Sequence, residues 1–179
     1  VWDRAITLTG FDGIEDTDWE NVRMLCGVGT TTTESPGLGF GLLYNWFAVN
    51  DARGIAPDGW HVPSLTELQT LITFLGGSSV AGGPLKATAK WATPNVGATN
   101  ASKFSAVPGG LRLLSPNSVF TELTTSGYYW SADEYDASRS YFLMLRDINT
   151  IADVTQYFGK YYGASVRFVR DSAVGYIDG

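Results

Sequence analysis

His61 and Cys26 are the residues of this sequence best suited to act as a base and a nucleophile, and each is the only one of its type. A Ser/His/Asp triad would have to use His61, yet the sequence has no Gly-x-Ser-x-Gly nucleophile elbow. Zinc sites use several Cys or His ligands, and one of each is too few. His61 stands just before the expected start of a helix, which favours a structural imidazole that holds a turn. We therefore predict no catalytic residue, no cofactor and no enzymatic activity.

Carboxylates are the other candidate chemical groups. Asp133, Glu134 and Asp136 are close in sequence, and hard oxygen ligands of this kind suit Ca²⁺. The Glu-Pro-Asn and Gln-Pro-Asp motifs of calcium-dependent sugar binding do not occur. We predict no metal site and keep calcium at this cluster as an open alternative. An enzyme with two facing carboxylates also stays open, because such partners can come from anywhere in a fold.

The segment 136–162 has the composition of a recognition surface. Tyr and Arg give large, rigid or bidentate contacts at low entropic cost, as in binding sites for proteins. We predict that recognition is carried by thirteen residues of this segment or its borders, which are Ser138, Arg139, Phe142, Met144, Arg146, Asp147, Asn149, Thr155, Gln156, Tyr157, Phe158, Tyr161 and Tyr162.

Alternation within 140–147 sets the expected faces. Tyr141, Leu143 and Leu145 repeat with a period of two, which predicts a strand with these side chains toward the core. Phe142 and its alternating neighbours are then expected to point outward, so that Phe142→Ala should weaken binding and barely change stability. The same pattern also fits a second core face or a stacked sheet edge.

The elements expected to position these residues form an α+β domain. Helical spacing predicts a helix over 42–50, and a capping box at Ser64–Glu67 predicts a second helix over 65–75. Short strands between turns follow, and we expect the scaffold residues Trp60, Trp130, Val166 and Phe168 to be buried. The expected strands are 103–107, 111–114, 119–123, 128–131, 140–147 and 164–170.

Composition limits the partners. The chain has 179 residues, 44% hydrophobic and 13% aromatic, which suits one globular domain. Its net charge of −6 and the lack of a basic stripe argue against nucleic acid and anionic membranes. No apolar run is long enough to insert in a membrane. Because the sequence begins with Val1, we expect a processed or trimmed piece of a larger protein.

Several motifs in one order resemble the Fibrobacter succinogenes major paralogous domain. The core of the resemblance is Gly59-Trp60-His61-Val62-Pro63-Ser64, followed by Glu67 and Leu71. The other matching segments are 43–49, 82–83 with 85–86, 94–95 with 97–100, 104–106 with 108–110, 127–131, 134–135, 165–167 and 169–171. The resemblance covers 40–171. We therefore expect an N-terminal extension, 1–39, that packs on or precedes the domain, and a C-terminal tail, 172–179.

The resemblance implies a C-type-lectin-like fold of two helices packed on short antiparallel strands. The family recurs in surface and secreted proteins and in phage tail adhesins of gut bacteria, and some members resemble variable proteins of diversity-generating retroelements. It thus implies a display domain on a virion tail or cell surface, with a retroelement-diversified face for a cell-surface protein or glycan receptor. A homotrimer within a larger fibre fits this role. The alternative is a carbohydrate-binding or structural surface domain of a gut bacterium without diversification.

Relatives usually carry two cysteines that this chain lacks. The corresponding positions are Ala56 and Phe168, so the disulfide that the resemblance implies is absent here. An oxidising compartment is then not required, which fits a virion protein assembled in a cytoplasm.

Overall fold

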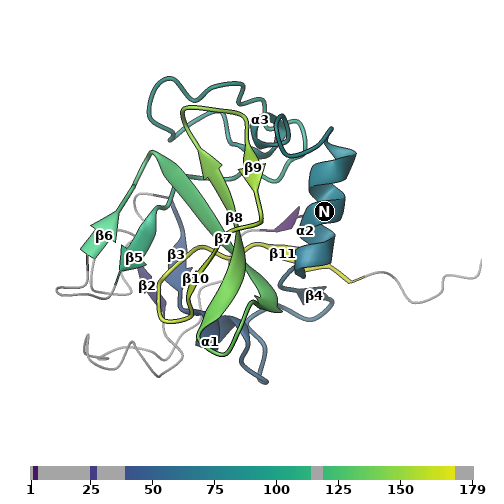
Figure 1. The fold of residues 1–179 in the computed structure, drawn as a ribbon, viewed down its shortest axis with the longest axis vertical. Coiled ribbons are helices and arrows are strands. Elements are labelled where there is room, and N and C mark those ends of the chain that lie inside the picture. Colours follow the sequence, from purple (N-terminus) through teal and green to yellow (C-terminus); the bar gives the residue numbers. More distant parts are fainter. Residues whose placement is uncertain (1, 4–24, 28–38, 114–118, 172–179) are drawn as a thin grey trace, which may run out of the picture.

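The computed structural model describes residues 2–3, 25–27, 39–113 and 119–171, and its architecture is α+β as predicted (Figure 1). The helices are α1 (Trp46–Val49), α2 (Leu65–Phe74) and α3 (Gly82–Leu85). The strands are β1 (Trp2–Asp3), β2 (Leu25–Gly27), β3 (Leu42–Tyr44), β4 (Trp60–His61), β5 (Leu111–Leu113), β6 (Val119–Thr121), β7 (Ser126–Glu134), β8 (Arg139–Arg146), β9 (Ala152–Asp153), β10 (Tyr157–Gly159) and β11 (Phe168–Arg170). In the described ranges, no helix has the length and apolar character needed to cross a membrane.

The main sheet is built around the long antiparallel hairpin of β7 and β8. Strands β10 and β9 both pair with the free edge of β8, so the order is β10–β8–β7 with β9 beside β8. A second sheet has the order β1–β11–β4, and the pairs β2–β3 and β5–β6 complete the strands. Strands β1 and β2 lie within the expected N-terminal extension, and they pair with β11 and β3 of the domain.

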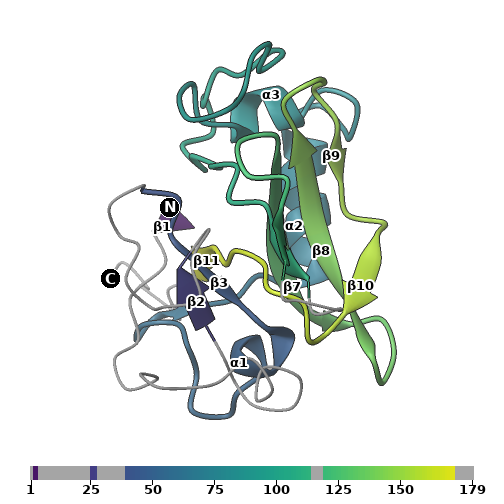
Figure 2. The ribbon, with the colours of Figure 1, turned by 90° about the vertical axis from the view of Figure 1, so that its left-hand side faces the viewer.

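The main sheet is buried on both faces. Figure 2 shows α2 behind the β7–β8 hairpin and the group of β3, α1 and β11 to the left of it. The core on the α2 side, which we call the helix-side core, consists of Leu68, Ile72, Ala81, Leu85, Trp91, Phe104, Ala106, Tyr129, Leu143, Leu145, Ala152 and Val154. The second core consists of Leu42, Tyr44, Trp46, Ala48, Val49, Ile55, Val62, Leu111, Tyr128, Trp130, Phe142, Ala164, Val166 and Phe168.

This arrangement corrects the expected faces of β8. Leu143 and Leu145 are buried in the helix-side core, as predicted. Phe142 is only 4% exposed and packs in the second core, so the prediction that it points outward is wrong. The reason is that Phe142 lies opposite Trp130 of β7, and the elements beyond the hairpin cover that face as completely as α2 covers the other.

The expected helix over 42–50 is a strand followed by one helical turn. The backbone of Tyr44 bonds to Ala164 in both directions, at 2.8 and 3.0 Å, which holds the first part extended. Asn45 then caps α1, because its side chain accepts the N–H of Ala48 at 3.0 Å. The apolar residues of this segment are buried both in β3 and in α1. Their spacing alone does not distinguish this arrangement from a single buried helix.

Other expectations are confirmed in part. Trp130, Val166 and Phe168 are buried as predicted, and Trp60 is half-buried. The segment 103–107 forms a bridge from Ala106 to Lys86 in place of a strand. Strand β11 is shorter than expected, and the short elements β4, β9, β10 and α3 were not predicted.

The start of α2 confirms the predicted capping box. Ser64 Oγ accepts the N–H of Glu67 at 3.2 Å, and the Glu67 carboxylate accepts the N–H of Ser64 at 2.9 Å. We expect Ser64→Ala to lower the free energy of unfolding by about 1 kcal/mol, because Ala cannot accept the Glu67 N–H. Urea unfolding measures this. Thr66→Ala, an exposed change in the same turn, is the control and should stay within about 0.5 kcal/mol; equal effects of the two changes would contradict the cap.

Candidate functional site

Tyrosines from the β7–β8 turn and from β10 gather at one end of the main sheet. The rings of Tyr135 and Tyr157 stack with centroids 3.6 Å apart and planes 8° from parallel. Tyr141 lies opposite Tyr157 across the strand pair and contacts Tyr135 edge to face at 5.5 Å. Tyr135 is 42% exposed and Tyr157 is 37% exposed. We call Tyr135, Arg139, Tyr141 and Tyr157 the tyrosine–arginine face.

Arg139 completes this face beside the stacked rings. Its Cζ is 4.8 Å from the Tyr135 centroid and 4.6 Å from the Tyr157 centroid. Because the two rings are nearly parallel and the distances nearly equal, the guanidinium lies along the edge of the stack and not on its outer surface. Both rings are partly exposed, at 42% and 37%, so a ligand can reach the pair next to a cation that favours aromatic neighbours.

Asp136 fixes the conformation of Arg139. One carboxylate oxygen accepts from Arg139 Nε at 2.7 Å, and the other accepts the backbone N–H groups of Ser138 and Arg139. The Arg139 side chain is the main reason that the pKa of Asp136 is held well below its ordinary value. A hydrogen bond with the Tyr157 side chain raises the pKa of Tyr135. The face is thus ordered before any ligand arrives, which reduces the entropic cost of binding.

Lys160 supports the β7–β8 turn from inside the protein. This side chain is 4% exposed, and its Nζ lies 4.5 Å from the centre of the Trp46 ring. The ammonium donates to the carbonyl of Ala137 at 3.1 Å and lies 3.1 Å from a carboxylate oxygen of Glu134. The turn that presents Tyr135 and Arg139 is therefore tied to α1 through a buried cation.

The predicted recognition residues fall in three places. Ser138, Arg139 and Tyr157 lie at the tyrosine–arginine face. Phe142, Met144 and Phe158 pack in or against the second core. Arg146, Asp147 and Asn149 lie at the far end of β8, about 23 Å from Arg139 along a strand that rises about 3.3 Å per residue. Asp147 is 7% exposed and Arg146 is exposed. The structure therefore does not gather the predicted residues into one surface.

The remaining predicted residues border the tyrosine–arginine face in sequence. Thr155 and Gln156 are exposed between β9 and β10. Tyr161 is 37% exposed and contacts Tyr162 edge to face at 4.8 Å, while Tyr162 reaches Phe158 at 5.6 Å. These rings connect the exposed segment after β10 to the second core.

Sequence reasoning missed Tyr135 and assigned Tyr141 to the core. Tyr141 is only half-buried, although it shares a sheet face with Leu143. A signal for Tyr135 was present, since an aromatic residue directly before the turn sequence Asp136-Ala137-Ser138-Arg139 is at the exposed end of a hairpin. The stacking partner Tyr157 is 22 positions away, and no local pattern connects the two.

The acidic residues considered for calcium have separate roles. Asp133 accepts the N–H of Leu65 at the start of α2 at 2.6 Å, Glu134 faces Lys160, and Asp136 holds Arg139. Within the parts of the chain that the structure describes, no three His, Cys, Asp or Glu side chains gather as a metal-ion site. Cys26 lies in β2, where its backbone pairs with Leu43.

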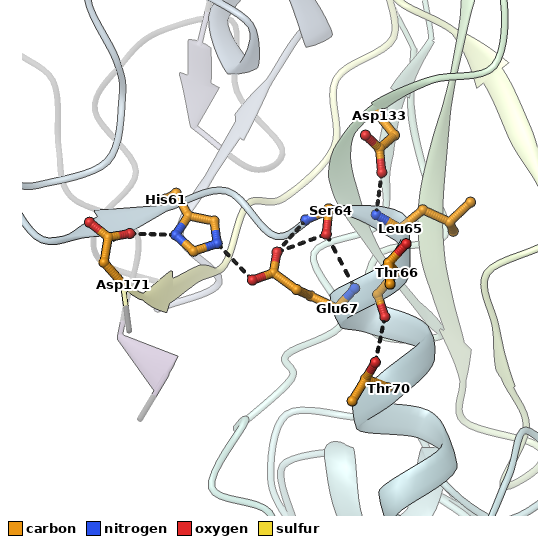
Figure 3. Close-up of polar contacts among 8 residues, drawn as sticks. All are labelled: His61, Ser64, Leu65, Thr66, Glu67, Thr70, Asp133 and Asp171. Atoms are coloured by element: carbon orange, nitrogen blue, oxygen red, sulfur yellow. Dashed lines mark hydrogen bonds and ion pairs between the residues drawn. The ribbon is translucent and has the colours of Figure 1, made fainter. Parts of the chain in front are cut away.

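His61 links two carboxylates, which agrees with the structural role predicted for it (Figure 3). Its Nε2 lies 2.9 Å from Glu67 Oε1, and its Nδ1 lies 2.5 Å from Asp171 Oδ1. Glu67 belongs to the capping box of α2, while Asp171 directly follows β11. The imidazole therefore links the helix start to the end of the second sheet, and in its protonated form it donates to both carboxylates.

This contact predicts a pH-dependent stability. Partial burial lowers the pKa of His61, but the hydrogen bonds to Asp171 and Glu67 outweigh burial, so its pKa is raised above 6.5. The protonated ring then stabilises the fold fully below that ordinary value, and the contribution is lost as pH rises through the higher folded value. We expect the free energy of unfolding, measured in urea, to be highest below pH 6.5 and to fall as the pH rises above that value. His61→Gln should flatten this slope, and an unchanged slope would refute the assignment.

Comparison with known proteins assigns the family. Neither the curated proteins nor the solved structures contain a match to this chain. A family model does match, and it covers residues 12–170. The match begins well before residue 40, so it includes much of the segment expected to be an extension. Because this model spans most of the sequence, the chain belongs to the Fibrobacter succinogenes major domain family.

Proposed function

We propose that this chain is a non-enzymatic recognition domain that binds a cell-surface protein or glycan through its tyrosine–arginine face. The observation that carries the proposal is the exposed, parallel Tyr135–Tyr157 stack with Arg139 along its edge. Exposed aromatic residues beside an arginine are the residue types that dominate binding energy at protein interfaces. Single apolar residues on a surface are normal, whereas exposed aromatic residues gathered in one patch mark interaction sites.

Preorganisation supports the same proposal. The Asp136 carboxylate fixes the Arg139 side chain, and the buried Lys160 fixes the β7–β8 turn, so little conformational entropy is lost on binding. The face also lies on strands and a tight turn of the scaffold, which is how rigid binding sites are built.

We further propose that the domain adopts a C-type-lectin-like arrangement and works as a phage tail-fibre tip or a surface adhesin with a retroelement-diversified face. The family membership and the position of three of the four residues of the face, Arg139, Tyr141 and Tyr157, within the 136–162 segment support this. Sequencing the DNA beside the gene tests it, because diversification requires a reverse-transcriptase gene and a mutated repeat. Without these, the chain is a surface domain with a fixed specificity.

Binding to cells tests the recognition function. The fluorescently labelled chain is incubated with a panel of intact gut bacteria and followed by flow cytometry. We expect saturable binding to some strains. Protease treatment of those cells should abolish binding if the receptor is a protein, and periodate oxidation should abolish it if the receptor is a glycan. Absence of binding across the panel, with the folded chain intact, would count against the proposal.

Tyr157→Ala distinguishes the face from the rest of the surface. We expect it to weaken cell binding by about 30-fold, the effect of losing about 2 kcal/mol at a hot spot. Stability should fall by only about 1 kcal/mol, because a half-exposed stacked ring is lost. Gln69→Ala, an exposed change on α2, is the control and should leave both properties unchanged. Normal binding by Tyr157→Ala would place recognition elsewhere.

A further inference from the structure

Lys86 is a lysine without access to solvent. It follows α3, and its relative exposure is 0%. Burial of an ammonium group costs several kcal/mol unless hydrogen bonds replace the lost water. Burial lowers the pKa of Lys86, and the nearby charge of Asp147 opposes that effect only in part. The burial of Lys86 therefore requires hydrogen-bond acceptors around its amino group.

The amino group is enclosed by backbone carbonyl oxygens. Nζ donates to the carbonyl of Val96 at 2.9 Å, of Arg146 at 2.9 Å and of Asn149 at 2.8 Å. An ammonium group has three protons, so these three bonds use its full donor capacity. The indole of Trp91 lies on another side, with its ring centre 5.4 Å from Nζ. The surroundings are those of a cation-binding site made of main-chain oxygens.

The three carbonyls come from two separate segments. Val96 belongs to the loop after α3, while Arg146 and Asn149 flank the turn after β8. The same segments also meet directly, since the N–H of Val96 donates to the carbonyl of Asp147 at 2.7 Å. The cation therefore holds together two loops whose carbonyl dipoles would repel one another without it. Bound metal ions commonly take this role between loops.

We propose that the oxygens around Nζ of Lys86 form a cation-binding site which this chain fills with its own side chain, and which takes a monovalent cation when the amino group is removed. The distances define the size of the cation. Calcium binds oxygen at about 2.3–2.6 Å, which is shorter than the 2.8–2.9 Å found here. The site therefore fits ammonium or potassium, for which backbone carbonyls replace the hydration shell.

Lys86→Ala tests the proposal because alanine removes the amino group together with the stem, which would otherwise overlap a cation bound at the Nζ position. We expect its melting temperature to fall by about 5–10 °C, since three buried carbonyls lose their donor. Ammonium or potassium chloride should then raise the melting temperature of the variant above the value in choline chloride at equal ionic strength. Calcium chloride should restore less. The same salts should have no specific effect on the unaltered chain.

Lys103→Ala is the matched control, because Lys103 is exposed and lies outside the site. It should melt like the unaltered chain in every salt. Equal stabilisation of Lys86→Ala by choline and potassium would overturn the proposal. A second measurement applies even if Lys86→Ala fails to fold: in the unaltered native chain, reductive methylation should modify Lys103 quickly and Lys86 only after unfolding. Methylation of both lysines at the same rate would also overturn it.

Discussion

Phe142→Ala should destabilise the domain by about 3–5 kcal/mol, the usual cost of deleting a buried phenylalanine. Phe142 is 4% exposed, and its ring packs 3.9 Å from that of Phe158 and edge to face with Trp130 and Tyr128. Removing it leaves a cavity among three aromatic rings, which cannot collapse without moving β7 and β10. Denaturant unfolding followed by tryptophan fluorescence measures the change.

The comparison with Leu143→Ala identifies how β8 is packed. Leu143 faces the helix-side core and is 0% exposed, so its replacement should cost about 2–5 kcal/mol as well. Similar losses from adjacent residues mean that both faces of the strand are core. If Phe142→Ala changed stability by less than about 1 kcal/mol while Leu143→Ala unfolded the chain, the second core described here would be wrong.

Gly110→Ala should be the other severe substitution, with a loss of about 3–5 kcal/mol. Gly110 has φ of +66°, which an L side chain rarely adopts. An added Cβ would overlap the carbonyl oxygen of Thr121 and lie 2.8 Å from the backbone nitrogen of Leu123. Both are main-chain atoms, so β6 and the residues that follow it would have to move away from Gly110. The change should appear as a lower urea midpoint.

Gly54→Ala separates the two causes of that loss. Gly54 has a similar φ of +72°, but nothing lies within 4 Å of the added Cβ. It should therefore cost only the backbone strain, about 1–2 kcal/mol. If Gly54→Ala and Gly110→Ala lowered the free energy of unfolding equally, the positive φ alone would explain both losses. The close approach of β6 to Gly110 would then contribute nothing to the loss.

These substitutions also separate scaffold from recognition. Phe142 and Gly110 affect the free energy of unfolding, whereas Tyr157 should affect cell binding first. The boundary between the two classes runs through β10, because Phe158 packs inward and Tyr157 stacks on Tyr135. A ligand-binding surface on this domain can therefore vary at Tyr157 without disturbing the aromatic core beneath it.

The sequence by itself determined the features whose interactions lie within a few residues. The capping box at Ser64 and Glu67 needs only four consecutive positions, and the helix that follows has the predicted start and nearly the predicted end. The structural role of His61 followed from its place before that cap. The α+β class followed from two predicted helices and a series of short strands between turns. The motifs that this chain shares with the family, in the same order, were sufficient to recognise the family.

Only the tertiary structure decided which side chains are covered. The period of two in β8 indicates that Leu143 and Phe142 face opposite sides of the sheet. It does not indicate whether another layer covers the Phe142 side, because that layer comes from β3, α1 and β11, which are distant in the sequence. The same limit applies to Lys86 and Lys160, whose burial no local pattern indicates. Each is buried because oxygen atoms from distant segments replace its water, and the Tyr135–Tyr157 stack likewise exists only because β10 pairs with β8.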